Sequence, residues 1–281
     1  MKIRRLTEAV GAEAEGLDLS LPIAPELAKE MRQAFIDAGV LIVRGQDLTP
    51  DQFVAFARCF GPDESYSGHL SEFLMPGHPE IITLSNMMEN GKPLGVQDAG
   101  QYWHTDRSYV AQPAWSSMLY SRKVPHDDSG QPLGDTLFAS TVAAFVALPK
   151  DEQARLEQLS VVHQYVFRFS KPNDSLPSVE HPLVLRHPVS GAKCLYVNAG
   201  FTHHVSGVTE RESSVLLEHL YAHCARDEFV YRHKWRVGDV LMWDNYSTIH
   251  NAVGNYGQHQ HRYMWRTTIQ GFPLPHMPTA A

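Results

Sequence analysis

The first residues suited to binding a metal ion lie in the segment Trp103-His104-Thr105-Asp106, which contains a His-x-Asp pair. In an extended backbone both side chains project from one face, because side chains alternate along a strand. An imidazole and a carboxylate could then hold two adjacent corners of a metal octahedron. A third ligand from a distant strand would complete a facial triad of two histidines and one carboxylate. Such a triad leaves three positions open, as iron(II) oxygenases require.

His250 is the candidate for that third ligand. The segment 240–245 indicates a buried strand that runs into a turn, and His250 follows it. A rigid strand end suits a metal ligand, although a structural histidine is the alternative. Two rival arrangements exist among the 16 histidines. His126-Asp127-Asp128 lies in a polar stretch that would not fix ligand geometry, and His219 with His223 more often marks an ordinary helix face.

A late segment, 262–269, carries two arginines at strand spacing. Arg262 and Arg266 share one face, while the alternate residues are mostly apolar. If the arginine face looks into a barrel, the buried guanidiniums need an anionic partner. A dicarboxylate could supply it through bidentate contacts, whereas an edge strand would leave both arginines in solvent. Taken with the His-x-Asp pair, Arg262 is predicted to anchor 2-oxoglutarate.

Short apolar segments between turn residues predict a mainly β fold with peripheral helices, a sandwich or jelly roll. Strands are predicted at 40–43, 81–84, 116–124, 136–139, 161–169, 182–186, 193–197, 229–235, 240–243 and 262–270. Helices are predicted at 25–38, 49–60, 150–158 and 209–225, the second and fourth beginning with capping boxes. Segment 86–100 is predicted to be a loop, and 1–281 a single domain. Whether 171–180 and 126–132 act as lids is left open.

The composition indicates an ordinary soluble globular protein, with 43% hydrophobic residues, 20% charged residues and a net charge of -7. The negative charge argues against a nucleic-acid partner. Three scattered cysteines favour free thiols in a reducing compartment. We see no secretory signal and no membrane span. We therefore expect a cytoplasmic protein without membrane partners, and a homo-oligomer, either a dimer or a tetramer.

The sequence resembles the taurine/2,4-dichlorophenoxyacetate dioxygenase (TauD/TfdA) family over nearly its whole length. The resemblance lies in a series of short motifs: Val43-Arg44-Gly45-Gln46, Phe56-Ala57-Arg58-Cys59-Phe60-Gly61, Trp103-His104-Thr105-Asp106, Gly134-Asp135-Thr136, His187-Pro188-Val189-Ser190-Gly191, Tyr196-Val197-Asn198, Trp243-Asp244-Asn245 and the arginine strand. It implies a double-stranded β-helix, a cupin-like jelly roll. It also implies an Fe(II)-dependent dioxygenase that consumes 2-oxoglutarate and O₂, hydroxylates a C–H bond, and releases succinate and CO₂.

The resemblance also implies a role for individual residues. His104, Asp106 and His250 would bind Fe(II). Arg262 and the Thr136 hydroxyl would hold the far carboxylate of 2-oxoglutarate. Two further residues, Arg266 and Phe201, would line the reacting region: Arg266 would face the substrate's anionic group beside the iron and cosubstrate, and Phe201 would belong to the substrate pocket.

Four departures from the taurine-type pattern put taurine itself in doubt. Gly100 stands in place of an asparagine, and Arg107 in place of a small apolar residue. The loop at 126–132 is lengthened, and His69 is the nearest match to the histidine that contacts sulfonate. Arg107 is interpreted equally as a substrate ligand or as part of a structural salt bridge. With Arg266, it suggests a substrate bearing a carboxylate, sulfonate, sulfate or phosphonate group.

Three other functions are compatible with parts of this pattern. A zinc hydrolase could use the same three ligands but would not need the Thr136/Arg262 pair. A non-catalytic jelly-roll binding protein would be expected to lack a ligand. A desaturase or cyclase of the same family would share every residue named. Halogenation is disfavoured, because Asp106 fills the position that a halide would need.

Overall fold

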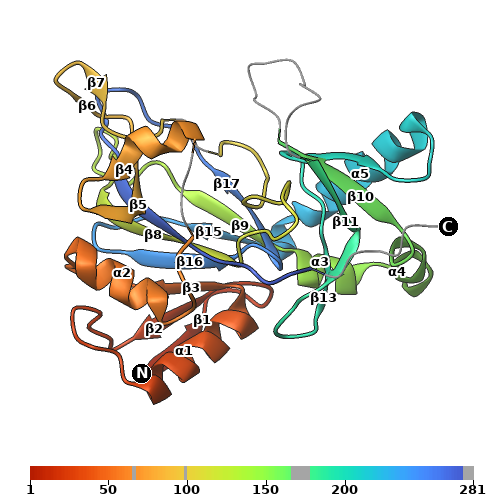
Figure 1. Ribbon diagram of the computed structural model, residues 1–281, viewed down its shortest axis with the longest axis horizontal. Helices are drawn as coiled ribbons and strands as arrows, with labels where there is room; N and C mark the ends of the chain where they lie inside the picture. Colours follow the sequence, from red (N-terminus) through yellow and green to blue (C-terminus); the bar gives the residue numbers. More distant parts are fainter. Residues whose placement is uncertain (65–67, 98–99, 166–177, 275–281) are drawn as a thin grey trace.

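A large twisted sheet forms the frame of the molecule, with two helices against one face (Figure 1). The computed structural model describes residues 1–64, 68–97, 100–165 and 178–274, and only the backbone at 68–70. In spatial order, the sheet comprises β1 (Lys2–Arg5), β2 (Ala12–Glu15), β3 (Val40–Val43), β16 (Val240–Asp244), β8 (Ser116–Lys123), β18 (Tyr263–Ile269), β5 (His78–Ser85) and β4 (Leu74–Met75). The described strands pair antiparallel except β2 with β3.

A second, smaller sheet supplies the other wall of the barrel. Its strands, in order, are β15 (Val230–His233), β9 (Thr136–Ser140) and β17 (Thr248–Ala252). One core joins the two walls: Ile42, Leu119, Leu241, Trp243 and Met264 from the large sheet meet Phe138 from β9 and Trp235 beyond β15. Two facing sheets around a shared core make a jelly roll, and the predicted fold class is confirmed.

The opposite face of the large sheet packs against α1 (Pro25–Ala38) and α2 (Pro50–Arg58). Strand alternation explains why both faces are apolar. Leu41, Tyr120, Met242 and Trp265 point to the helices, while their sequence neighbours point into the barrel. Both helices were predicted. The first ends at Gly39, whose φ of 68° is left-handed, and the second begins with the expected Thr49/Gln52 capping box.

A second group of elements packs beside the barrel and forms its own apolar core. It contains α3 (Thr141–Ala147), α4 (Lys150–Leu156), α5 (Glu210–Cys224), β10 (Ser160–Gln164), β11 (Ser178–Pro182), β12 (Val184–Arg186), β13 (Lys193–Leu195) and β14 (Thr202–Val205). Short pieces complete the described chain: η1 (Gly68–Phe73), η2 (Asp227–Phe229), β6 (Met88–Glu89) and β7 (Lys92–Pro93). Every helix in the described part of the chain is too short or too polar to span a bilayer.

Several predicted elements differ from the observed ones. The segment predicted as a loop at 86–100 contains the β6–β7 hairpin. Helix α3 was missed, because its sequence is apolar on all sides and gives no helical periodicity. The strand predicted at 161–169 ends at Gln164, and 166–169 lie outside the described residues, as does most of 171–180. Segment 126–132 is a turn closed by Asp127, which accepts bonds from Ser129 and from the Gln131 backbone.

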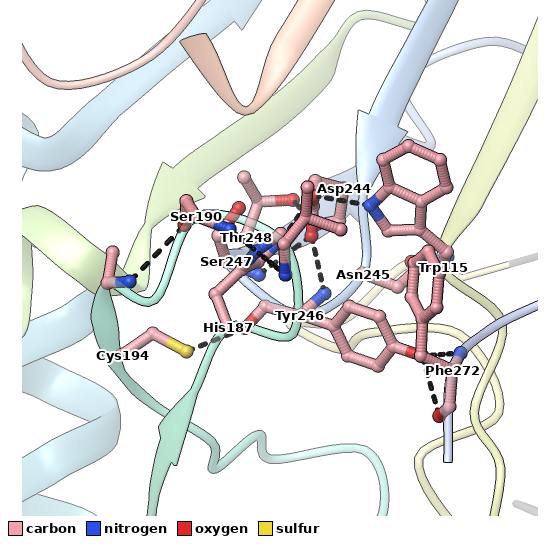
Figure 2. Close-up of polar contacts among 12 residues, drawn as sticks. Trp115, His187, Ser190, Cys194, Asp244, Asn245, Tyr246, Ser247, Thr248 and Phe272 are labelled. Atoms are coloured by element: carbon pink, nitrogen blue, oxygen red, sulfur yellow. Dashed lines mark hydrogen bonds and ion pairs between the residues drawn. The ribbon is translucent and has the colours of Figure 1, made fainter. Parts of the chain in front are cut away.

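A buried carboxylate holds the turn between β16 and β17 (Figure 2). Asp244 Oδ2 accepts bonds from Trp115 Nε1 at 2.9 Å and His187 Nε2 at 2.8 Å. Its Oδ1 accepts the backbone N–H groups of Tyr246 and Ser247 at 2.8 and 3.1 Å. All four donors come from buried groups, so the carboxylate fixes the path by which the chain enters β17.

We predict that Asp244→Asn lowers the free energy of unfolding by about 3 kcal/mol, because an amide would turn a donor toward Trp115 or His187. Urea denaturation measures the loss. Asp47→Asn is the matched control, since the Asp47 side chain is 98% exposed in its contact with Arg122. Equal denaturation midpoints for the two variants would contradict the prediction.

Candidate active site

Three buried side chains converge where the two sheets meet. His104, Asp106 and His250 each offer a ligand atom, and these atoms lie within 4.8 Å of one another. Across 1–64, 71–97, 100–165 and 178–274, this is the only cluster of histidine, cysteine and carboxylate groups that could hold a metal ion. The structure therefore brings together the residues that the sequence predicts as the facial triad.

The two histidines are joined through their backbones. His104 N–H donates to the His250 carbonyl at 3.0 Å, and His250 N–H donates back at 2.7 Å. The ring centroids lie 4.0 Å apart. His104 Nδ1 bonds the Tyr102 carbonyl at 2.8 Å, which leaves Nε2 directed toward Asp106, 3.9 Å from Oδ1. The His250 ring packs on Trp243, with centroids 4.7 Å apart.

Two glycines leave room for the His104 side chain. A Cβ on Gly100 would lie 2.4 Å from His104 Cε1 and 2.9 Å from Nε2, and one on Gly200 would lie 2.9 Å from His104 Cβ. Gly100 also has a φ of 79°, which disfavours other residues. The predicted departure at Gly100 is thus a packing requirement beside a candidate ligand.

The second oxygen of Asp106 is held away from the histidines. Asp106 Oδ2 accepts from Ser117 Oγ at 2.6 Å and pairs with Arg266 Nη2 at 2.7 Å. Arg266 Nη2 also reaches Ser117 Oγ at 3.1 Å, and Asn245 Oδ1 accepts the Asp106 N–H at 3.2 Å. These contacts leave Oδ1 as the oxygen that faces His104.

The protonation states suit a divalent cation. Burial lowers the pKa of His104, and burial together with the His104 ring lowers the pKa of His250, so both rings are neutral donors. Burial alone would raise the pKa of Asp106, but the Arg266 guanidinium and the Ser117 hydrogen bond act in the opposite direction, and that pKa lies below its usual range. Among the described residues His250 Nδ1 is buried without a hydrogen-bond partner. One carboxylate and two neutral imidazoles form a donor set that fits Fe(II).

Arg262 lies in a pocket next to this triad. The pocket lining also includes Tyr256, Gly134, Gln101 and Ala252, and the last two are three and two residues from His104 and His250 respectively. Arg262 is only 9% exposed. Burial lowers its pKa, and the Tyr256 hydroxyl acts in the opposite direction.

A tryptophan connects Arg262 with Thr136. The Arg262 guanidinium lies 6.0 Å from the Trp235 ring centroid, and Trp235 Nε1 donates to Thr136 Oγ1 at 3.0 Å. In the described part of the chain no carboxylate forms an ion pair with Arg262, and its Nε has no hydrogen-bond partner. A buried cation in this state favours an anionic ligand.

Arg107 forms an ion pair with Glu64, a residue that the sequence analysis did not predict. Its Nη2 lies 3.0 Å from Glu64 Oε1, and Arg107 adopts a left-handed φ of 56°. Glu64 is anchored by its N–H to the Thr268 carbonyl at 2.8 Å. Burial raises the pKa of Glu64, while Arg107 and Arg266 act to lower it. The salt-bridge interpretation of Arg107 is therefore the one seen in this structure.

Aromatic rings cover the side of His104 that faces β10 and β14. Phe201 lies 6.1 Å from His104, 4.9 Å from Tyr109, 6.2 Å from Tyr102 and 6.3 Å from Tyr165, measured between ring centroids. Phe201, predicted as a substrate-pocket residue, thus lies beside the candidate ligand His104.

The three rival histidines of the sequence analysis do not join the cluster. His126 is exposed on its turn. His219 pairs with Glu152 at 3.2 Å, and His223 bonds the Ala144 carbonyl at 2.8 Å, so both have structural partners. His69 lies in η1, and its side chain is outside the part of the chain that the structure describes.

Sequence reasoning missed Ser117, Asn245, Tyr109, Glu64 and Tyr256. Asn245 could have been found, because it belongs to the quoted motif Trp243-Asp244-Asn245. The other four stand in segments without a distinctive pattern, and only the fold places them beside the charged groups.

We predict that Gly100→Ala lowers the affinity for Fe(II) or Mn(II) roughly tenfold or more, because the methyl group would displace the His104 ring. Gly16→Ala is a matched control: Gly16 has a similar φ of 76°, but a Cβ there would meet no heavy atom of the described chain within 4 Å. Both variants bear the cost of a left-handed alanine. Metal titration should separate them, and equal affinities would refute a steric role for Gly100.

Comparison with known proteins places this geometry in a family. Residues 2–268 match the model of the "Taurine catabolism dioxygenase TauD, TfdA family". The chain is 36% identical over 261 residues to the alpha-ketoglutarate-dependent 2,4-dichlorophenoxyacetate dioxygenase of Cupriavidus pinatubonensis, covering 86% of this chain and 88% of that protein.

Solved structures agree with the sequence match. A putative alpha-ketoglutarate-dependent taurine dioxygenase from Burkholderia xenovorans superposes with a TM-score of 0.83 at 32% identity, covering 97% of this chain and 90% of that one. AAD-2 in complex with Mn(II) and N-oxalylglycine gives a TM-score of 0.81 at 30% identity, covering 97% and 98%. The chain therefore belongs to the TauD, TfdA family and is a 2-oxoglutarate-dependent dioxygenase.

Proposed function

We propose that the protein binds Fe(II) through His104, Asp106 and His250, and uses 2-oxoglutarate and O₂ to hydroxylate a C–H bond of a small organic anion. Two neighbouring features support this proposal. The first is the buried triad, and the second is the buried Arg262 in the adjoining pocket, which forms no ion pair with a carboxylate among the described residues. When bound, the iron and cosubstrate supply the redox chemistry, and the protein supplies position, charge and exclusion of water.

The cosubstrate's far carboxylate would be held by Arg262 and the Thr136 hydroxyl. The Trp235 N–H already donates to Thr136 Oγ1, so the hydroxyl proton is directed elsewhere and can be given to a carboxylate. The complex of the similar AAD-2 contains N-oxalylglycine, which shares with 2-oxoglutarate a carbonyl next to a carboxylate and a distal carboxylate.

The substrate would place its anionic group at Arg266 and an apolar body against the aromatic rings. Arg266 is the cation nearest the triad, 2.7 Å from Asp106. Phe201 and Tyr109 offer an aromatic wall close to His104. A relative is named for its action on 2,4-dichlorophenoxyacetate, which combines an aromatic ring with one carboxylate. We favour aryloxyalkanoates, sulfonates and sulfate esters as the substrate class.

Alternative functions are less well supported. A zinc hydrolase has no use for the buried Arg262, and the family relatives are named as dioxygenases. Desaturation or ring closure would use the same residues and differs only in the product. We further propose that 1–281 acts as a single domain. The homo-oligomer and the cytoplasmic location stay predictions.

The function predicts a spectroscopic signature. Anaerobic addition of Fe(II) and 2-oxoglutarate should give a weak visible charge-transfer band, and a substrate anion should shift it. An absorbance titration with phenoxyacetates, alkyl sulfonates and alkyl sulfates measures both effects. Folded, iron-loaded protein that shows no band would contradict the proposal.

We predict that Arg262→Ala weakens 2-oxoglutarate binding about a hundredfold, because it removes the cation from a desolvated charge pair. Metal affinity should stay unchanged, since Arg262 is not among the triad contacts. Calorimetry on the metal-loaded protein measures both. Arg155→Ala, at a 60% exposed side chain, is the control. Unchanged 2-oxoglutarate affinity would show that Arg262 is not the anchor.

A further inference from the structure

A negative charge at Glu64 is unexpected beside a site that should attract anions. The Glu64 side chain is only 15% exposed, and its Oε1 lies 3.0 Å from Arg107 Nη2. Among the described residues its Oε2 is buried without a hydrogen-bond partner, as is Arg107 Nε. Arg107 directly follows the candidate ligand Asp106, and both Arg266 and Asp106 act electrostatically on Glu64. The acid thus belongs to the charged surroundings of the triad.

The position of Glu64 is fixed by the barrel rather than by a free loop. Its N–H donates to the Thr268 carbonyl, and Asp63 forms an antiparallel bridge with Ile269, so the segment pairs with the end of strand β18. Arg266 lies two residues from Thr268 on the same strand. A carboxylate held in this way and paired with Arg107 contributes a negative charge to the field at Arg266.

The charges of the loaded site then nearly cancel. Two positive charges on Fe(II) balance two negative charges on 2-oxoglutarate. Three arginines, Arg107, Arg262 and Arg266, stand against two carboxylates, Asp106 and Glu64. One positive charge is left for the substrate. In a desolvated site a monoanion completes the balance, whereas a dianion leaves an unpaired negative charge, which is costly.

We propose that Glu64 is a specificity-determining residue: by neutralising Arg107 it restricts the site to substrates with one negative charge and excludes dianions. The inference rests on the proposed function, because the count includes Fe(II) and 2-oxoglutarate. It assigns the substrate to singly charged carboxylates, sulfonates or sulfate esters, and it removes phosphonates from the candidates.

Phenyl sulfate and phenyl phosphate are suitable probes, because they match in size and shape but differ in charge. At about pH 8 the sulfate carries one negative charge and the phosphate close to two, since its second pKa is about 6. Calorimetry on protein loaded with Mn(II) and 2-oxoglutarate measures the affinity for each probe without turnover. Wild-type protein should bind the sulfate more tightly.

Glu64→Gln should shift the affinity ratio toward the phosphate by roughly ten- to a hundredfold, the effect of one charge several ångström away at an effective dielectric constant of about 20. Arg107→Gln should shift the ratio in the opposite direction, and the double variant should return it to near the wild-type value. Glu80→Gln is the control, because Glu80 pairs with Arg58 on the surface, and it should leave the ratio unchanged.

The variants separate a charge effect from a merely structural ion pair. A structural role predicts that both single variants weaken both probes alike and that the double variant does not recover. That result would overturn the inference. So would an unchanged ratio of the two probe affinities in Glu64→Gln, or a wild-type protein that binds neither probe. Failure to bind Mn(II) and 2-oxoglutarate would instead refute the proposed function. If Glu64→Gln fails to fold, the direction in which Arg107→Gln shifts the affinity ratio tests the inference: a shift toward the sulfate supports it, and any other result overturns it.

Discussion

The backbone bridge between His104 and His250 is the constraint on which the rest of the site depends. Its two hydrogen bonds, of 3.0 and 2.7 Å, join segments that are far apart in the chain. Because both histidines are placed by folding, a metal ion need not meet the entropic cost of collecting its ligands. The turn held by Asp244 delivers β17 to this bridge, and Gly100 and Gly200 leave the space that the His104 ring occupies. The closeness of the rings also requires them to be neutral, which burial ensures.

The three arginines near the triad have different partners, and the partners indicate different roles. Arg266 is paired with Asp106 and Arg107 with Glu64, so each already has a carboxylate. Arg262 is buried beside the Tyr256 hydroxyl and the Trp235 ring, without a carboxylate partner in the described part of the chain. A buried guanidinium is stable only with compensation. The cosubstrate would supply that compensation at Arg262, whereas Arg107 needs no ligand to be stable.

Periodicity and motifs in the sequence predicted much of the fold and of the candidate site, for physical reasons. The period of two in 262–269 put Arg262 and Arg266 on one face of a predicted strand, and in the structure Met264 of that face packs into the barrel core. Capping boxes located α2 and α5 closely. Helix α3 was missed because its exposed side is as apolar as its buried side, with Val146 64% exposed, so the sequence shows no helical periodicity. Glu64 and Ser117 could not be predicted, because their roles come from strand pairing across the sheet and leave no local pattern.

Arg266 joins the metal ligand to the expected place of the substrate. Its Nη2 holds Asp106 Oδ2 together with Ser117, yet a guanidinium has five N–H donors in a rigid fork. In the proposed function Arg266 would contact a substrate anion while its Nη2 keeps Asp106 in place. An anion bound there would draw on the same positive charge that holds Asp106 ionised, so substrate binding and the donor strength of the carboxylate are coupled through one side chain.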